Sequence, residues 1–392
     1  MPDQQTKIES LFLRKIGKRP GRVVVRSPGR VNLIGEHTDY NEGFVLPAAI
    51  DKAIVFVVSP RTDRVVRFVA SDLDDEFSIA FTAIQRSPKG WPNYLLGVIE
   101  ELRVLGHTFP GCDVVFGGDI PIGAGMSSSA AVECGFAFAL NHLFGFGISK
   151  LDLVQLGQRS ENNFVGMKCG IMDQFVNVFG EDRTVLKIDC RSLAYEHFPF
   201  ERTDLAIVLC ETELKRSLAS SEYNIRRRQC EVGVAILRKH RPEVRSLRDV
   251  TPEFLQEHRA EMEPIVYRRC DYVVKENERV LRASDDLRRN DFRSFGEQMY
   301  RSHSGLRDEY QVSSPDLDFL VDAASAAPGV LGARMMGAGF GGCTINLVEQ
   351  QSVQAFVEEM KSRYHHRTGI ANNVYVTHIE SGTCLLRPGE YK

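Results

Sequence analysis

The chain has 392 residues, of which 43% are hydrophobic and 26% charged, and its formal net charge is −3. These values are ordinary for a soluble globular protein, and the length suits two domains of moderate size better than one. With so small a net charge there is no broad basic face, which argues against nucleic acid as a partner. No apolar run approaches the length of about eighteen residues that a membrane-spanning helix needs, so we expect no membrane partner and no secretion.

Short β-branched or apolar runs predict strands along the first half of the chain, at 23–26, 54–59, 113–116, 184–189 and 205–210. Between them, apolar residues at three- and four-residue spacing predict an amphipathic helix over 94–105. After about residue 220 the pattern becomes helical, over 223–239 and 266–282 and from Ser314 onward, before strands return at 343–348 and 373–379. The order of elements predicts an α+β fold.

The segment from Arg26 to Pro47 places Arg30, Glu36, His37 and Asp39 within ten residues, between two apolar runs. Burying an ionised side chain without a partner is costly, so these groups are best explained as converging on a polar ligand or on one another. The alternative is a salt-bridge cluster in a surface turn.

A second polar motif, PIGAGMSSSAA at 121–131, places glycines before three serines and leads into an apolar run that ends near residue 143. This pattern predicts a loop that feeds a helix N-terminus, where free backbone N–H groups and the helix dipole favour an anion. An isolated turn of this kind is more often only a helix start. The candidate phosphate-binding residues are Gly123, Ala124, Gly125, Met126, Ser127, Ser128 and Ser129.

Nine cysteines lie between Cys112 and Cys384 without C-x-x-C pairs or metal-ligand spacing. We interpret them as reduced and mostly buried thiols, which predicts a cytoplasmic protein.

Three further segments complete a recognisable set: CGIMDQF at 169–175, SLASSEYNIRRRQCE at 217–231 and GAGFGGC at 337–343. With the two motifs above, they resemble the galactokinases, which are members of the GHMP family of small-molecule kinases. The resemblance spans nearly the whole chain. It implies a two-domain GHMP kinase fold, in which an N-terminal domain like the second domain of ribosomal protein S5 and a C-terminal ferredoxin-like domain enclose the active site. We place the domains at 1–205 and 206–392, with a final tail that can pack back on the first.

The resemblance implies that the chain uses ATP, with Mg²⁺ as cofactor, to phosphorylate D-galactose at the C1 hydroxyl. This reaction is the first phosphorylation step of galactose catabolism, the Leloir pathway. The expected partners are then the small molecules galactose and ATP, bound by a monomer or a weak homodimer.

By the same resemblance, Asp39 should grip the O3 and O4 side of the sugar, while Glu36 and His37 hold the O6 side. Gly170 would offer its backbone N–H to the sugar and Tyr223 its hydroxyl, although a tyrosine at the head of a helix is more often plain packing.

The resemblance also places Mg²⁺ between Glu161 and a loop serine, Ser129 in preference to Ser128, because this hard cation prefers oxygen ligands. It puts Trp91 near the adenine. Without the family, Glu161 would be interpreted as a solvated helix residue and Trp91 as ordinary core.

Arg30 and Asp173 are the expected catalytic pair at the anomeric hydroxyl. In one mechanism Asp173 removes the C1 proton as general base while Arg30 stabilises charge on the phosphoryl oxygens. In the other, Arg30 so favours the carboxylate that Asp173 mainly orients the nucleophile. We favour the second, because a loose transition state asks little of a base.

Two alternative functions remain at this stage. One is a kinase for N-acetylgalactosamine, which needs space beside C2, and the other is a non-catalytic sensor of galactose and ATP on the same fold. Arabinose lacks the C6 hydroxymethyl group and would leave the partners of that group unfilled. We call residues 121–131 the serine loop. Its three serines are all present, which favours an enzyme over a sensor.

Overall fold

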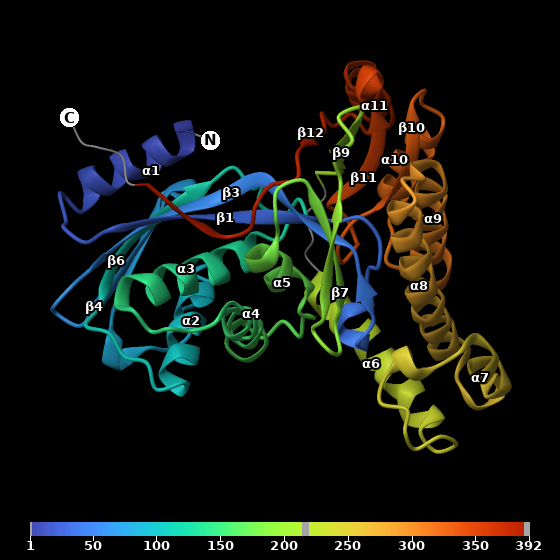
Figure 1. Cartoon of the computed structure of the whole chain (residues 1–392), viewed down its shortest axis with the longest axis horizontal. Coiled ribbons are helices and arrows are strands. Elements are labelled where there is room, and N and C mark those ends of the chain that lie inside the picture. The colour runs from blue at the N-terminus through green and yellow to red at the C-terminus, as the bar shows by residue number, and fades with distance from the viewer. Residues whose placement is uncertain (1, 214–218, 388–392) are drawn as a thin grey trace.

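The computed structural model describes residues 2–213 and 219–387, so the first residues of the predicted motif at 217–231 lie outside the described part. The described chain is a mixture of helices and mostly antiparallel sheets, which confirms the predicted α+β class. Figure 1 shows the larger sheet with its helices at one end of the molecule and a second group of helices and strands at the other.

The larger sheet has six strands in the order β13-β1-β3-β6-β4-β5, and only the β4–β6 pairing is parallel. Helix α1 covers one face of this sheet, whereas α2 and α3 lie on the other (Figure 1). The elements are β1 (Val23–Asn32), β3 (Pro47–Pro60), β4 (Val65–Ala70), β5 (Asp75–Ala80), β6 (Cys112–Gly118), β13 (Cys384–Leu386), α1 (Pro2–Lys15), α2 (Pro92–Val104) and α3 (Ser128–Phe144).

Strand β3 is apolar along most of its length because both faces of the sheet are covered. Its Val55 and Val57 pack beneath α1 with Phe12, whereas Phe56 and Val58 belong to the main core on the other side. A strand buried on both faces has no need for alternating polar residues. The run of valines therefore fixes this strand at the centre of the domain.

A second sheet has four antiparallel strands in the order β10-β11-β9-β12. Ser314 caps the helix that follows it by accepting a hydrogen bond from the Leu317 N–H at 3.3 Å, as its position before a proline predicts. The elements are β9 (Leu205–Glu211), β10 (Val330–Met335), β11 (Cys343–Glu349), β12 (Val374–Thr377), α6 (Ala219–Leu237), α7 (Pro252–Glu257), α8 (Pro264–Arg288), α9 (Phe292–Ser304), α10 (Pro315–Ser325) and α11 (Val353–Thr368).

A small third sheet joins the two larger groups of elements. It consists of β2 (Phe44–Val45), β7 (Thr184–Asp189) and β8 (Tyr195–Pro199), and it lies beside α4 (Lys150–Arg159) and α5 (Met172–Phe179). The short β2 strand lies near the end of the first polar motif (residues 26–47), so the polar residues of the motif are held between this sheet and the six-stranded one.

All nine cysteines lie in the described chain as free thiols, and six of them are buried. Within residues 2–213 and 219–387, no helix is both long enough and apolar enough to span a bilayer.

Candidate active site

A cavity of about 350 Å³ lies where the first polar motif, the serine loop, the start of α5 and α6 meet. Most of the residues that the sequence nominates line this cavity. They are Arg30, Glu36, His37, Asp39, Gly123, Gly125, Met126, Ser127, Ser128, Ser129, Glu161, Gly170, Asp173 and Tyr223. Segments that are far apart in the sequence therefore form one site, which also includes Gly337 and Ala338 of the third glycine motif.

At the centre of the cavity, Arg30 and Asp173 form a two-pronged ion pair. The Arg30 Nε and Nη2 atoms each donate to one carboxylate oxygen of Asp173 at 2.8 Å, and Nη1 donates to the Gly125 carbonyl at 2.5 Å. The Ser127 hydroxyl donates to the same carboxylate. Burial acts to lower the pKa of Arg30, but the charges of Asp173 and Glu36 outweigh it and raise this pKa above its ordinary value. The site therefore holds a fixed positive charge beside a carboxylate.

The backbone at Gly29 brings Arg30 against the serine loop. The register of the β1–β3 pairing shifts between Pro28 and Arg30, and the Arg30 N–H donates to the Met126 carbonyl at 3.1 Å. A Cβ on Gly29 would lie 2.7 Å from that carbonyl oxygen, closer than real Cβ atoms approach. Only glycine therefore allows β1 to contact the loop.

The serine loop leaves the start of α3 open to an anion. Gly123 and Gly125 have positive φ angles of 86° and 87°, and Ser127 is also left-handed with a φ of 57°. Ser127 is the N-cap residue of α3, yet its side chain does not cap the helix and bonds to Asp173 instead. The first backbone N–H groups of α3 thus keep their capacity to bind phosphate oxygens.

Glu36 bridges the cavity and the third glycine motif. Its Oε1 atom accepts hydrogen bonds from the Gly337 N–H at 2.7 Å and from Arg334 Nη2 at 3.0 Å. Arg334, at the end of β10, is fully buried and also donates to the carbonyls of Leu33 and Met335, each at 2.7 Å. The sequence gives no signal for Arg334, because a single arginine in a strand is usually exposed.

His37 is a buried, neutral ring held by two tyrosines. Its Nδ1 lies 2.8 Å from the Tyr40 hydroxyl, which is in turn 2.7 Å from the Tyr310 hydroxyl. Burial, helped by the positive charges of Arg226 and Arg334, lowers the pKa of His37 to about 3. Tyr223 closes this side of the cavity, with its ring 5.4 Å from that of His37. The imidazole can therefore exchange hydrogen bonds with a hydroxyl group but does not carry charge near neutral pH.

Asp39 lies directly against Gly170. A Cβ on Gly170 would fall 1.9 Å from the Asp39 Oδ2 atom, so no side chain fits there without displacing the carboxylate. Burial, together with the negative charge of Asp173, raises the pKa of Asp39 to about 7. Asp39 is thus a confined acceptor whose ionisation falls within the physiological pH range.

If Asp39 binds a sugar, as the resemblance implies, a Gly170→Ala substitution should raise the KM for that sugar by about 10- to 100-fold, the cost of losing charge-assisted hydrogen bonds to one carboxylate. The added methyl group must push Asp39 away from its present position. Steady-state kinetics at saturating nucleotide would measure the effect. Because the serine loop is untouched, the KM for the nucleotide should not change. If Asp39→Ala and Gly170→Ala together lose as much as the sum of the single losses, the two residues do not act through one contact.

The same expectation, that Asp39 binds a sugar, predicts that sugar binding in the absence of nucleotide weakens as the pH falls below about 7. Asp39 has a raised pKa of about 7, so it is ionised above this pH and protonated below it, where it loses acceptor capacity. Well below that pH, affinity should fall by up to about tenfold per pH unit. Titration calorimetry between pH 5.5 and 8.5, at roughly half-unit steps, would show it. An Asp39→Asn variant should bind more weakly and with a flat pH profile.

The side chain of Glu161 contacts Ser129, the serine of the loop that lies in the first turn of α3. Glu161 lies in a short π-helical segment (Ser160–Val165), where its Oε2 accepts a hydrogen bond from Gln174 Nε2 at 2.9 Å. Burial and the charge of Asp173 raise the pKa of Glu161 to about 7, although the Ser129 hydroxyl acts to lower it. A carboxylate and a hydroxyl in contact are suitable oxygen ligands for Mg²⁺.

Two nominated residues lie outside the cavity lining. Ala124, which is part of the serine loop, is fully buried. Trp91 packs near Phe116, with 5.9 Å between ring centroids, and its Nε1 donates to Asp75 at 2.9 Å, while Tyr94, one helical turn away, lines the cavity. A contact between Trp91 and the adenine stays a prediction.

Three family descriptions match this chain. Residues 10–60 match the galactokinase galactose-binding signature, residues 93–181 match the N-terminal domain of GHMP kinases, and residues 283–366 match the C-terminal domain of GHMP kinases. Together these matches cover both polar motifs and extend into the second sheet.

The whole chain is also similar to individual proteins. It is 46% identical over 371 residues to a galactokinase from Roseiflexus sp. (strain RS-1), covering 95% of this chain and 94% of that protein. The structure of Lactococcus lactis galactokinase complexed with galactose superposes with a TM-score of 0.93 at 34% identity, covering 97% of this chain and 99% of that one. Mevalonate kinase from Methanococcus jannaschii shares the fold at a TM-score of 0.65 and 17% identity, with 93% and 100% coverage.

Proposed function

The chain belongs to the galactokinases, a family of GHMP kinases, and on this basis we propose that it transfers the γ-phosphoryl group of ATP to the C1 hydroxyl of D-galactose. The products are galactose 1-phosphate and ADP. The observation that carries the proposal is the Arg30–Asp173 pair, which lies between the first polar motif (residues 26–47) and the serine loop in one cavity. At that point the Asp173 carboxylate can accept from the hydroxyl to be phosphorylated, and the Arg30 cation can contact the phosphoryl group that is transferred.

The sugar occupies the side of the cavity formed by Asp39, His37, Glu36, Gly170 and Tyr223. Asp39 accepts hydrogen bonds from the O3 and O4 hydroxyls, since it is confined against Gly170 and directed into the cavity. The neutral His37 ring contributes a hydrogen bond at O6. Glu36 has its Oε1 occupied by Arg334 and Gly337, so its other oxygen is the one that serves the sugar.

The phosphates of ATP lie on the serine loop at the start of α3. The support is the pair of left-handed glycines and the uncapped helix N-terminus. Ser129 and Glu161 would hold Mg²⁺, whose charge neutralises the phosphate oxygens when the ion is bound.

Transfer to C1 depends mainly on position and electrostatics. Arg30 is held rigidly by three hydrogen bonds, two to Asp173 and one to Gly125, so its charge is already in place when the phosphoryl group moves. Asp173 accepts from Arg30 and Ser127, and the galactose C1 hydroxyl joins these donors, which aligns its oxygen for attack. The hydroxyl proton passes to Asp173 late, because a loose transition state needs little base assistance.

The proposal extends to the organisation of the chain. We place the boundary between the two domains at 205/206, where β9 begins and the second sheet takes over. The free cysteines favour a reducing compartment, which fits the cytoplasm. We propose a monomer, with a weak homodimer as the alternative.

The test is to incubate the purified protein with Mg·ATP and, separately, with galactose, N-acetylgalactosamine, glucose, arabinose and mevalonate, measuring ADP and the phosphorylated product. ADP formation with galactose, a product phosphorylated at C1 and little response to glucose would support the proposal. A faster reaction with N-acetylgalactosamine than with galactose would identify N-acetylgalactosamine as the preferred substrate. Binding of galactose without turnover of any sugar would contradict catalysis and indicate a sensor.

A further inference from the structure

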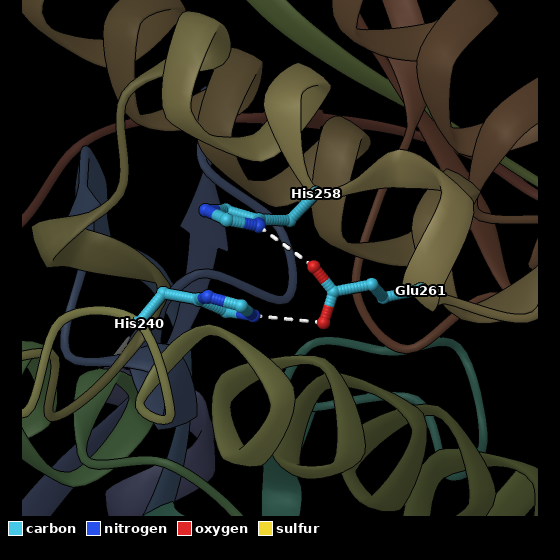
Figure 2. A group of neighbouring side chains, drawn as sticks. All are labelled: His240, His258 and Glu261. Atoms are coloured by element: carbon cyan, nitrogen blue, oxygen red, sulfur yellow. Dashed lines mark hydrogen bonds and ion pairs between the residues drawn. The ribbon is translucent and has the colours of Figure 1, made fainter.

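A second cluster of polar side chains lies well away from the cavity, at the far end of α6. Figure 2 shows His240 and His258 directing one ring nitrogen each toward Glu261. His240 Nε2 lies 2.7 Å from the Glu261 Oε2 atom, and His258 Nδ1 lies 2.9 Å from Oε1. The imidazole rings are stacked, with 3.9 Å between centroids and 20° between planes. Potential ligand atoms of the three residues all lie within 4.8 Å of one another.

Local backbone structure fixes two of these residues on one side of a turn. His258 ends α7 and precedes a short 3₁₀ helix, Arg259–Glu261, in which the Glu261 N–H donates to the His258 carbonyl at 3.1 Å. Because a 3₁₀ helix has three residues per turn, positions three apart project in the same direction. The His258 ring also packs edge-on against Phe254, at 4.9 Å.

The third residue comes from a different element. His240 follows α6, and its N–H donates to the Leu237 carbonyl at 3.1 Å, which continues the last turn of the helix. The cluster therefore connects the end of α6 to the turn after α7.

Within the described residues, the two histidines are the hydrogen-bond partners of the Glu261 carboxylate, one on each oxygen. Two arginines close to the cluster in sequence contact aromatic rings: Arg241 lies over the Phe254 ring at 3.9 Å and Arg259 over the Tyr267 ring at 5.0 Å. The side chains of His240 and Glu261 are 36% and 43% exposed, so an ion can reach them from solvent.

We propose that His240, His258 and Glu261 form a binding site for a zinc-like divalent ion, separate from the active site. Two imidazole nitrogens and one carboxylate are ligands that suit Zn²⁺, and three protein ligands leave one position for water. Mg²⁺ should not compete, because it prefers a shell of oxygen ligands. For binding, the stacked rings must separate and each nitrogen that faces Glu261 must release its proton to solvent, so that two nitrogen lone pairs converge on the ion in place of the present hydrogen bonds.

Such an ion would cross-link the segment between α6 and α8. Its three ligands lie on both sides of α7, so the bound ion would close this loop and hold the end of α6 in place. Since an ion that binds only the folded state stabilises it, zinc should raise the melting midpoint of the protein. The consequence reaches beyond the loop because α6 also carries Tyr223, which lines the active-site cavity.

The experiment compares zinc binding by the full-length wild type with that of His240→Ala, His258→Ala and Glu261→Gln variants. Zinc is titrated against a chromophoric chelator in the presence of excess Mg²⁺, and the melting midpoint is followed in parallel. His366→Ala is the matched control, because His366 is an exposed histidine on α11 outside the cluster. Sugar-dependent ATP turnover in Mg²⁺ alone serves as the check that each variant is folded.

We expect each of the three variants to bind one equivalent of zinc fewer than the wild type and to lose the zinc-dependent rise in melting midpoint. His366→Ala should match the wild type in both measurements. The result is the difference in zinc content between the wild type and each variant. Zinc bound at other thiols or carboxylates is present in both and does not affect this difference. Equal zinc content in wild type and variants would overturn the proposal, as would a wild type that binds no zinc. Failure of the sugar-kinase proposal would appear separately, in the turnover assay.

Discussion

An Asp173→Asn variant should show a kcat about 10²- to 10⁴-fold below that of the wild type, the range for removing a positioned proton acceptor or a preorganised charge. The carboxylate receives two hydrogen bonds from Arg30 and one from Ser127. An amide presents an NH₂ group to one of these donors, so Arg30 must move and the nucleophile loses its alignment. Single-turnover measurements at saturating ATP and galactose would report the chemical step directly.

Ser127→Ala provides the control for this prediction. It removes one donor to Asp173 but leaves the two-pronged contact with Arg30, so the loss should be much smaller than for Asp173→Asn. A single-turnover rate for Asp173→Asn within about threefold of the wild type would contradict both the orienting and the general-base mechanism. A solvent isotope effect on the wild-type rate would favour the general base, because it requires the proton to move in the transition state.

The second large effect concerns stability. Arg334→Met should lower the free energy of unfolding by about 3–5 kcal/mol, since it removes one partner of a fully buried ion pair and leaves the other charged. Glu36 would lose Arg334 Nη2, and the carbonyls of Leu33 and Met335 would lose their donors. Urea denaturation followed by circular dichroism, with tryptophan fluorescence as a second probe, would measure the change.

The double variant Arg334→Met/Glu36→Gln separates the two sources of this loss. Removing the Glu36 charge should recover part of the stability, because an uncompensated buried charge costs more than a buried amide. If the double variant were less stable than Arg334→Met by the full cost of Glu36→Gln, the two residues would not be energetically coupled. A loss below about 1 kcal/mol for Arg334→Met alone, typical of an exposed ion pair, would contradict the importance of its burial.

The sequence was most informative where a pattern is local. The predicted strands correspond to β1, β3, β6, β7, β9, β11 and β12, and the start of α10 directly after Ser314 follows from a serine cap and a proline. The β4–β5 hairpin and α1 were not predicted. Helix α1 is mostly polar, so its sequence does not indicate that it packs on a sheet. Its Ile8 and Phe12 are nevertheless fully buried against the sheet.

The candidate site divides in the same way. The motifs identified the residues that line the cavity, but not the partners that position them. The tyrosines that hold His37 come from segments far apart in the sequence, and Tyr310 follows α9 with no motif around it. The contact of Gly170 with Asp39 likewise depends on how two loops fold together. Such pairings are properties of tertiary structure, so one sequence without relatives cannot reveal them.

The strand β13 gives the fold a dependence on the order of synthesis. It pairs with β1 along Val24↔Leu386 to Arg26↔Cys384, so a strand from late in the chain forms the edge of the sheet beside one from its beginning (Figure 1). A ribosome makes β1 long before β13, at roughly 5–20 residues per second. Until β13 is made, β1 has no neighbour on that side, and an open strand edge of this kind is a template for misassembly. The pairing of β13 thus covers an edge that the rest of the sheet leaves open.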